Sequence, residues 1–182
     1  MFGRGRAADT ADAIERHIPA LRRFAWALLR DGAAADDLVQ DCLERALSRW
    51  HLRRAEGDLR AWLFTILHNL FLNGRRGAGR RGKVVPVEGD TGEAFADEAA
   101  GTAAESLLVW RDALAGLAAL PEEQRVVLLL VGVEDFSYEE TARLLGVPPG
   151  TVMSRLSRGR ARLHRLIEGE DAPARPALRR VK

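Results

Sequence analysis

The chain has 182 residues, of which 47% are hydrophobic, and its 28 basic and 26 acidic side chains leave a net charge of only +2. This length and composition suffice for one medium-sized core or two small ones. The single cysteine, Cys42, excludes an intrachain disulfide, and no apolar run approaches the roughly 20 residues of a membrane span, so we expect a cytoplasmic protein with no membrane insertion.

The chain begins with a glycine- and arginine-rich stretch, and the first predicted helix covers residues 11–30. Its apolar side chains recur at three- and four-residue steps. Pro19 lies inside this pattern and can kink or divide the helix. Asp31 and Gly32 should end it.

A second helix is predicted over residues 34–50. Asp36 and Asp37 stand at its start, where the helix dipole favours acids. The pattern predicts that one side of the helix, made of Leu38, Cys42, Ala46 and Leu47, is buried. The opposite side, made of Gln40, Asp41 and Glu44, is predicted to be exposed to solvent.

The third predicted helix starts at Asp58 and runs through LRAWLFTILHNLFLN. Apolar residues occupy nearly every direction around its axis, which is typical of a helix in the middle of a bundle. Its polar exceptions are Thr65, His68 and Asn69, and an asparagine in such a helix is more often a satisfied core or cap amide than a group that reads a ligand. The following residues 74–82 contain four arginines among glycines, for which we expect a flexible cationic loop suited to phosphates.

Residues 83–105 have no sustained hydrophobic period and contain six acidic residues against one basic residue, so they are interpreted as a flexible acidic linker. Helical patterns resume over residues 106–120, and Pro121 should begin a further helix with an apolar core over residues 126–133. No strand is expected. Residues 169–182 are interrupted by proline and are expected to be disordered.

Residues 136–167 contain a helix-turn-helix pattern. Ser137 followed by Glu140 fits a capping box, Gly146 supplies a left-handed helix end, and Pro149 is suited to the first position of the next helix. Two helices joined by so short a turn must cross steeply.

The second of these helices has one packing side and one cationic side. By helical register, Val152, Leu156, Leu163, Leu166 and Ile167 share the packing side, and Arg155, Arg158, Arg162 and Arg165 share the neighbouring side. Ser154 and Ser157 point outward near the helix start, where a recognition helix presents short polar groups to the major groove. We therefore expect DNA as the target. The linker could span at most roughly 75 to 83 Å, whereas two turns of duplex advance about 70 Å, so it could join modules bound at separate sites on one DNA.

Three stretches together resemble the extracytoplasmic-function class of bacterial sigma factors, within the sigma-70 family. They are ADDLVQDCLERAL, RAWLFTILHNLFLNGRR and LPEEQRVVLLLVGVEDFSYEETARLLGVPPGTVMSRLSRGRARL, in the order and spacing of that family. The resemblance implies an all-α protein of two small domains, with σ2 at residues 10–82 and σ4 at residues 106–168. It also implies a function: to bind core RNA polymerase, recognise −10 and −35 promoter elements and promote transcription initiation.

The resemblance also implies partners and site residues. Asp36, Asp37, Gln40 and Asp41 match the segment that docks on the clamp helices of the polymerase β′ subunit, and σ4 is expected to meet the β flap. An anti-sigma factor is expected as a further partner by resemblance only. Asn69 matches the position that reads the −10 element, which replaces the structural reading of this asparagine. Asn73 stands where an aspartate is usual, and Arg75, Arg76, Arg80 and Arg81 would hold the phosphates of the separated strand.

In σ4, Ser154, Arg155 and Arg158 match positions that contact the −35 element, with Ser157 and Arg162 alongside. Thr151 near the helix start could meet a phosphate. Met153 stands where the family often has lysine or arginine, and Pro148 where a capping serine is usual, so no −35 preference transfers directly.

Three other functions were weighed. A stand-alone helix-turn-helix regulator would leave the acids at 36–41 and the arginine loop without a role. A sigma-like decoy that binds an anti-sigma factor would not need cations for phosphates. An enzyme is not supported, because the sequence shows no nucleophile–base pair, metal-ligand cluster or phosphate-cradling glycine motif. We expect no catalytic residues, no metal and no cofactor.

Overall fold

The computed structural model describes residues 10–53, 57–81 and 116–168, and the regular structure in these ranges is entirely helical. The predicted linker, the C-terminal tail, the N-terminal nine residues and most of the helix predicted at 106–120 lie outside the described residues. The all-α expectation is therefore confirmed for the described part of the chain.

Helices α2 (Ile18–Leu29), α3 (Gly32–Ser48) and α4 (Leu59–Arg81) form one group. Pro19 divides the first predicted helix. Residues 10–15 are helical, a turn follows, and α2 then begins at Ile18 with Pro19 as its second residue. Arg30 ends α2 in a left-handed conformation, and Asp31 caps α3 by accepting a hydrogen bond from the backbone N–H of Ala34. Asp31 thus starts the second helix instead of ending the first.

The structure of α3 differs from the prediction in two details. Asp36 and Asp37 lie in the second turn of the helix, outside the first turn where the dipole acts most strongly. Cys42 and Ala46 are buried as predicted and Leu38 is half-buried, but Leu47 is 55% exposed. A short 3₁₀ helix, η1 (Trp50–Leu52), follows.

Helix α4 passes through the core and is longer than the sequence predicts. Leu63, Phe64, Leu67 and Phe71 are buried. The helix continues to Arg81, whereas the sequence pattern predicts a loop from Gly74 onward. Each added residue of an established helix gains a hydrogen bond, and arginine is a good helix former, which offsets the cost of the glycines.

The second group consists of α7 (Glu122–Gly132), α8 (Tyr138–Leu145) and α9 (Pro149–Ile167). Both hydrogen bonds of the Ser137–Glu140 capping box form, Gly146 ends α8 with φ of 65°, and Pro149 opens α9. The helix-turn-helix prediction is therefore confirmed. Val152 and Leu156 are buried, but Ile167 is 55% exposed because it is the last residue of α9.

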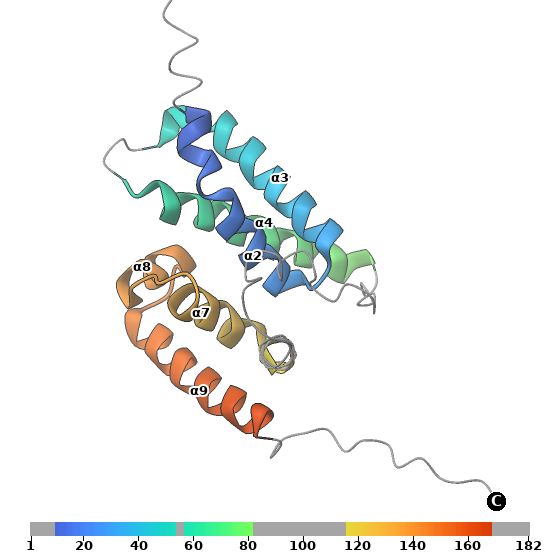
Figure 1. The fold of residues 1–182 in the computed structure, drawn as a ribbon, viewed down its shortest axis with the longest axis vertical. Coiled ribbons are helices and arrows are strands. Elements are labelled where there is room, and N and C mark those ends of the chain that lie inside the picture. Colours follow the sequence, from blue (N-terminus) through green and yellow to red (C-terminus); the bar gives the residue numbers. More distant parts are fainter. Residues whose placement is uncertain (1–9, 54–56, 82–115, 169–182) are drawn as a thin grey trace, which may run out of the picture.

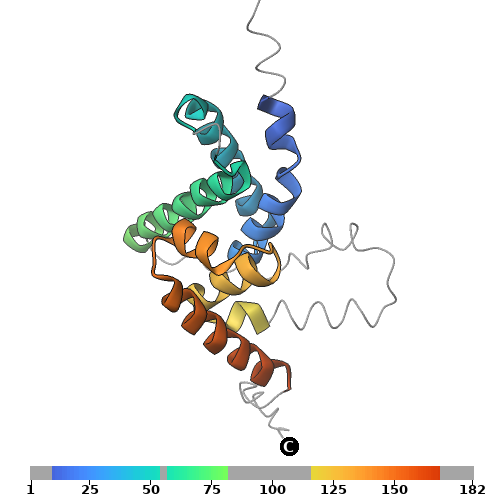
Figure 2. The same ribbon diagram turned by 90° about the vertical axis from the view of Figure 1, so that its left-hand side faces the viewer.

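The two groups pack directly against each other. Figure 1 shows α2, α3 and α4 at one end and α7, α8 and α9 at the other, with α9 on the outside, and Figure 2 shows the same division from the side. One hydrophobic core crosses the boundary, since Phe64 of α4 stacks edge-on against Phe136 at a centroid distance of 5.1 Å. A second, smaller core lies between α7, α8 and α9.

Candidate nucleic-acid interface

The outer side of α9 presents a polar and cationic surface. Ser154, Ser157 and Arg158 are exposed. The guanidinium of Arg158 donates to the carbonyl of Ser154 at 3.1 Å and to its hydroxyl at 3.3 Å. These bonds lie within one helical turn, so they place the charge of Arg158 beside the serine without burying it.

The other predicted residues of α9 differ in accessibility. Arg155 has a side chain only 23% exposed, and it donates to Glu123 of α7 at 2.7 Å. Thr151 is half-buried, whereas Arg162 is exposed. The structure thus brings Ser154, Ser157, Arg158 and Arg162 to the surface, while Arg155 joins α9 to α7.

A second polar surface lies on α4. Asn69 and Asn73 are exposed and lie one turn apart. Because α4 continues to Arg81, helical register places positions 76 and 80 on the same face as the two asparagines. Of the side chains at positions 76, 80 and 81 the structure describes nothing. The exposed Arg75 forms an ion pair with Glu122 of α7.

A third surface on α3 is acidic. Its exposed members are Asp36, Asp37, Gln40, Asp41 and Glu44. Arg22 of α2 binds both carboxylate oxygens of Asp36, at 2.8 and 3.1 Å, and the amide of Gln40 donates to Glu44 at 3.1 Å. Asp37 and Asp41 are exposed as well, and they leave their charge on the surface of α3.

Two ionisable groups buried behind these surfaces, Cys42 and His68, are neutral near pH 7. Burial raises the pKa of the Cys42 thiol to about 12 and lowers the pKa of His68 to about 4. Within residues 10–53, 57–81 and 116–168 no three histidine, cysteine or acidic side chains gather as a metal site would need. None of the helices described is long and apolar enough to cross a bilayer.

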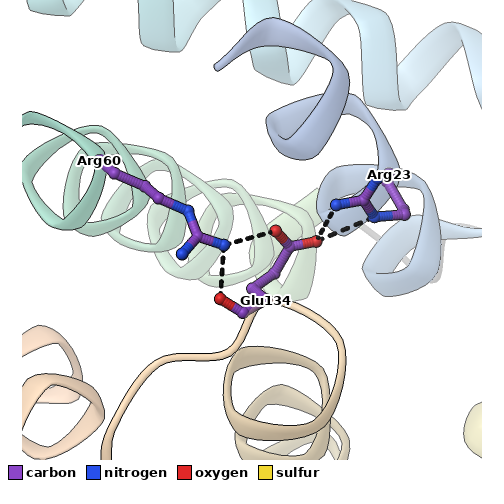
Figure 3. Close-up of polar contacts among 3 residues, drawn as sticks. All are labelled: Arg23, Arg60 and Glu134. Carbon is purple, nitrogen blue, oxygen red and sulfur yellow. Dashed lines mark hydrogen bonds and ion pairs between the residues drawn. The ribbon is translucent and has the colours of Figure 1, made fainter. Parts of the chain in front are cut away.

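The sequence did not reveal the ion pairs that join distant segments. Figure 3 shows the carboxylate of Glu134 between Arg23 of α2 and Arg60 of α4. Arg22 and Glu122 are likewise partners of predicted site residues, at separations of 14 and 47 positions. No short-range spacing could have found them, since each depends on how the helices pack.

Comparisons with known proteins place both groups of helices in sigma factors. Residues 14–68 match the family model "Sigma2 domain of PhyR", and residues 111–163 match "Sigma-70, region 4". The ECF RNA polymerase sigma factor EcfG of Rhodopseudomonas palustris is 39% identical over 86% of this chain and 83% of its own length. The ECF RNA polymerase sigma factor SigL of Mycobacterium tuberculosis is 36% identical over 78% of this chain and 79% of its own length.

Solved structures agree in fold. The sigma factor RpoE, solved in complex with the anti-sigma factor NepR from Bartonella quintana, matches with a TM-score of 0.73 and 32% identity, over 88% of this chain and 97% of its own. CnrH, solved with the cytosolic domain of CnrY, matches with a TM-score of 0.66 at 23% identity, over 92% of each chain, and supports the fold alone. The extent and identity of these matches show that this chain belongs to the extracytoplasmic-function sigma factors of RNA polymerase.

Proposed function

We propose that this chain binds core RNA polymerase through α3, reads the −10 element with α4 and the −35 element with α9, and thereby starts transcription at a class of promoters. One observation supports the whole scheme. An exposed acidic surface and two exposed polar surfaces with arginines lie on three different helices of one chain. A polymerase and two DNA elements need such separate surfaces.

The acidic surface of α3 suits a basic protein partner. Asp37, Gln40 and Asp41 are exposed on a helix that Cys42 and Ala46 anchor to the core. A rigid helix presents its charges in a fixed arrangement. A basic partner can therefore bind them without the entropy cost of ordering a flexible segment. We assign this surface, including Asp36, to the β′ clamp helices, and the σ4 helices to the β flap.

The α4 surface suits a separated DNA strand. A side-chain amide both donates and accepts, so exposed Asn69 can pair with the edge of an unstacked base. Asn73 lies one turn further, and the arginines at positions 75, 76, 80 and 81 follow on the same helix. Asn69→Ala should impair strand opening more than duplex binding, and normal permanganate reactivity in the variant's open complex would remove this assignment.

The α9 surface suits duplex DNA. Ser154, Ser157 and Arg158 occupy the exposed first half of a helix whose other side is buried. We assign the two serines to base edges in the major groove, Thr151, Arg158 and Arg162 to neighbouring phosphates, and Arg155 to orienting α9 through Glu123.

Further parts of the proposal concern catalysis, location and control. Sigma factors are regulators that bind DNA, and we assign no catalysis, metal or cofactor to this chain. It would act in the cytoplasm, where RNA polymerase is found. An anti-sigma factor is proposed as its inhibitor, because the sigma factor RpoE was solved with such a partner.

The test is transcription with purified core polymerase on a library of genomic templates, followed by sequencing of the transcript starts. The expected result is a set of starts that share −10 and −35 sequences and require the added chain. Starts that are the same with and without the folded, inhibitor-free chain would contradict the proposal.

A second candidate function is that of a decoy for an anti-sigma factor. The model matched by residues 14–68 is the σ2 domain of PhyR, and a PhyR structure is described as that of an anti-anti-sigma factor. A decoy needs no DNA contact, so it would bind an anti-sigma factor equally well after Ser154 and Arg158 are replaced, and it would give no promoter-specific transcript.

A further inference from the structure

One large apolar side chain lies on the outer face of α9, among the polar groups assigned to DNA. Met153 is 54% exposed, and it belongs to neither of the two hydrophobic cores formed by the described residues. Figure 1 shows α9 on the outside of the molecule. The side chain of Met153 is therefore available to a partner outside the chain.

Helical register places Met153 in the part of α9 that the proposed function assigns to base edges. It directly precedes Ser154 and lies one turn before Ser157, and both serines are exposed. A helical side chain leans toward the helix N-terminus, so the side chain of Met153 extends toward the turn that contains Gly150. Because methionine is longer than serine, Met153 projects further than either serine toward a bound duplex.

Gly150 leaves the neighbouring turn of α9 bare. It is exposed, and a methyl group added there would meet nothing within 4 Å. Gly146 is the only glycine of the described residues with a positive φ, so the backbone conformation of Gly150 does not require glycine either. Glycine also lowers the stability of a helix relative to alanine. Packing and conformation thus give no reason for glycine here, whereas a close approach of DNA to the start of α9 does.

The exposed face of α9 differs chemically on the two sides of its serines. By register, the order around the helix is Met153, Ser157, Ser154 and Arg158. Arg158 donates to the carbonyl and the hydroxyl of Ser154, which holds a positive charge on one side. Met153, on the other side, has no charge and no hydrogen-bond donor, and its sulfur is a weak acceptor.

This chemistry selects what Met153 can contact in a major groove. A lysine or arginine at the same position would bind a phosphate whatever the sequence. An uncharged thioether cannot do so. The apolar group that the major groove presents is the 5-methyl group of thymine, and the unbranched, flexible side chain of methionine adapts well to such a surface.

We infer that Met153 determines part of the −35 specificity by packing against the 5-methyl group of a thymine. The inference rests on the proposed function, because it requires α9 to lie in the major groove of the −35 element. The contact buries about one methyl group, which corresponds to a preference of roughly fourfold for thymine over uracil.

The first experiment selects DNA with core polymerase loaded with the full chain. The probe is a promoter obtained from the sequenced transcript starts, with its −35 positions randomised. The unaltered chain should select thymine at a position where Met153→Ala shows no preference, and both should select the same bases elsewhere. Ile167→Ala is the matched control, since Ile167 is also apolar, lies on α9 and is 55% exposed, but stands at the other end of the helix.

The second experiment removes the methyl group from the DNA. Each thymine of the selected −35 duplex is replaced in turn by deoxyuridine, and the apparent Kd of the loaded polymerase is measured by competition. One replacement should weaken binding roughly fourfold for the unaltered chain and for Ile167→Ala, and should not affect Met153→Ala or Met153→Lys. Such non-additivity assigns the contact to this pair of groups. Met153→Lys should also steepen the dependence of log affinity on log salt by about 1.

The outcomes separate this inference from the proposed function. A −35 sequence selected without thymine, or a uracil effect of equal size in Met153→Ala and the unaltered chain, would overturn the inference and leave the role of α9 intact. The same holds if Met153→Ala weakens binding to core polymerase and leaves the selected sequence unchanged, since Met153 would then contact the polymerase. If the loaded polymerase selects no −35 sequence at all, the role proposed for α9 fails, and the inference fails with it.

Discussion

Arg22 of α2 donates hydrogen bonds to both carboxylate oxygens of Asp36 of α3, at 2.8 and 3.1 Å. One acid of the proposed polymerase-binding surface is therefore already paired within the chain. Both side chains remain about half exposed, so the pair contributes little to stability. The pair instead changes the charge of the acidic surface of α3. It partly neutralises the end nearest the start of the helix, and leaves Asp37 and Asp41 to attract a basic partner.

Replacing Asp37 and Gln40 by alanine should weaken binding to core polymerase about tenfold, since both exposed groups lie in the middle of this surface. Titration of fluorescent core polymerase with the variant measures the loss. The matched control is Asp12→Ala, an exposed acid outside α3. Equal affinities for the double variant and the control would show that the polymerase binds elsewhere.

Arg158→Ala should weaken binding to −35 duplex DNA and lower the slope of log affinity against log salt by about 1, because one phosphate-neutralising charge is lost. Arg160→Ala is the control, an exposed arginine on a different side of α9. Affinities are measured by fluorescence anisotropy at several salt concentrations. An Arg158 variant with unchanged affinity at low salt would exclude a role for this guanidinium in DNA contact.

The local elements could be predicted from sequence because short-range chemistry specifies them. Ser137 and Glu140 are three residues apart, Gly146 takes the left-handed conformation, and Pro149 opens α9 as expected. Local signals failed where two rules compete. The glycines after Asn73 suggested a loop, but the continuing helix outweighs them to Arg81.

Contacts between distant segments could not be predicted. Nothing near Glu134 in the sequence distinguishes it from exposed Asp135, and only packing gives it Arg23 and Arg60 as partners. Similarly, the pattern of arginines on α9 did not show that Arg155 is held by Glu123. The candidate surfaces could be located, but which of their charges are already paired depends on the tertiary structure.

Gly159→Ala should destabilise the packing of α9 on α7. A methyl group there would lie 2.9 Å from Cδ1 of buried Leu128 and 3.3 Å from Cβ of Gln124. The neighbours must shift, which we expect to cost about 1 to 3 kcal/mol. Urea unfolding followed by circular dichroism measures the change.

Gly132→Ala is the control for this cost, because a methyl group at the end of α7 meets nothing within 4 Å. Its effect should be neutral or slightly stabilising, through the better helix propensity of alanine. If Gly159→Ala is as stable as Gly132→Ala, Leu128 moves aside freely and the close packing of these helices is not required.

His68 should make the fold less stable in mild acid. Burial lowers its pKa in the folded chain to about 4, from an ordinary value of 6.5. Between these two values the unfolded chain binds a proton that the folded chain does not, so the free energy of unfolding rises with pH across this window and falls on acidification. The full loss, reached near pH 4, is up to about 3 kcal/mol.

The measurement is urea unfolding at several values between pH 4 and pH 7, for the unaltered chain and for His68→Leu. The leucine variant keeps an apolar group at a position that is 7% exposed, and it removes the proton that opposes folding. The capping carboxyl of Glu140, whose pKa is lowered by its hydrogen bonds to Ser137, is present in both proteins and affects both curves alike. The difference between the curves should grow as pH falls from 6.5 to 4, and parallel curves would mean that His68 is protonated without cost in the folded state.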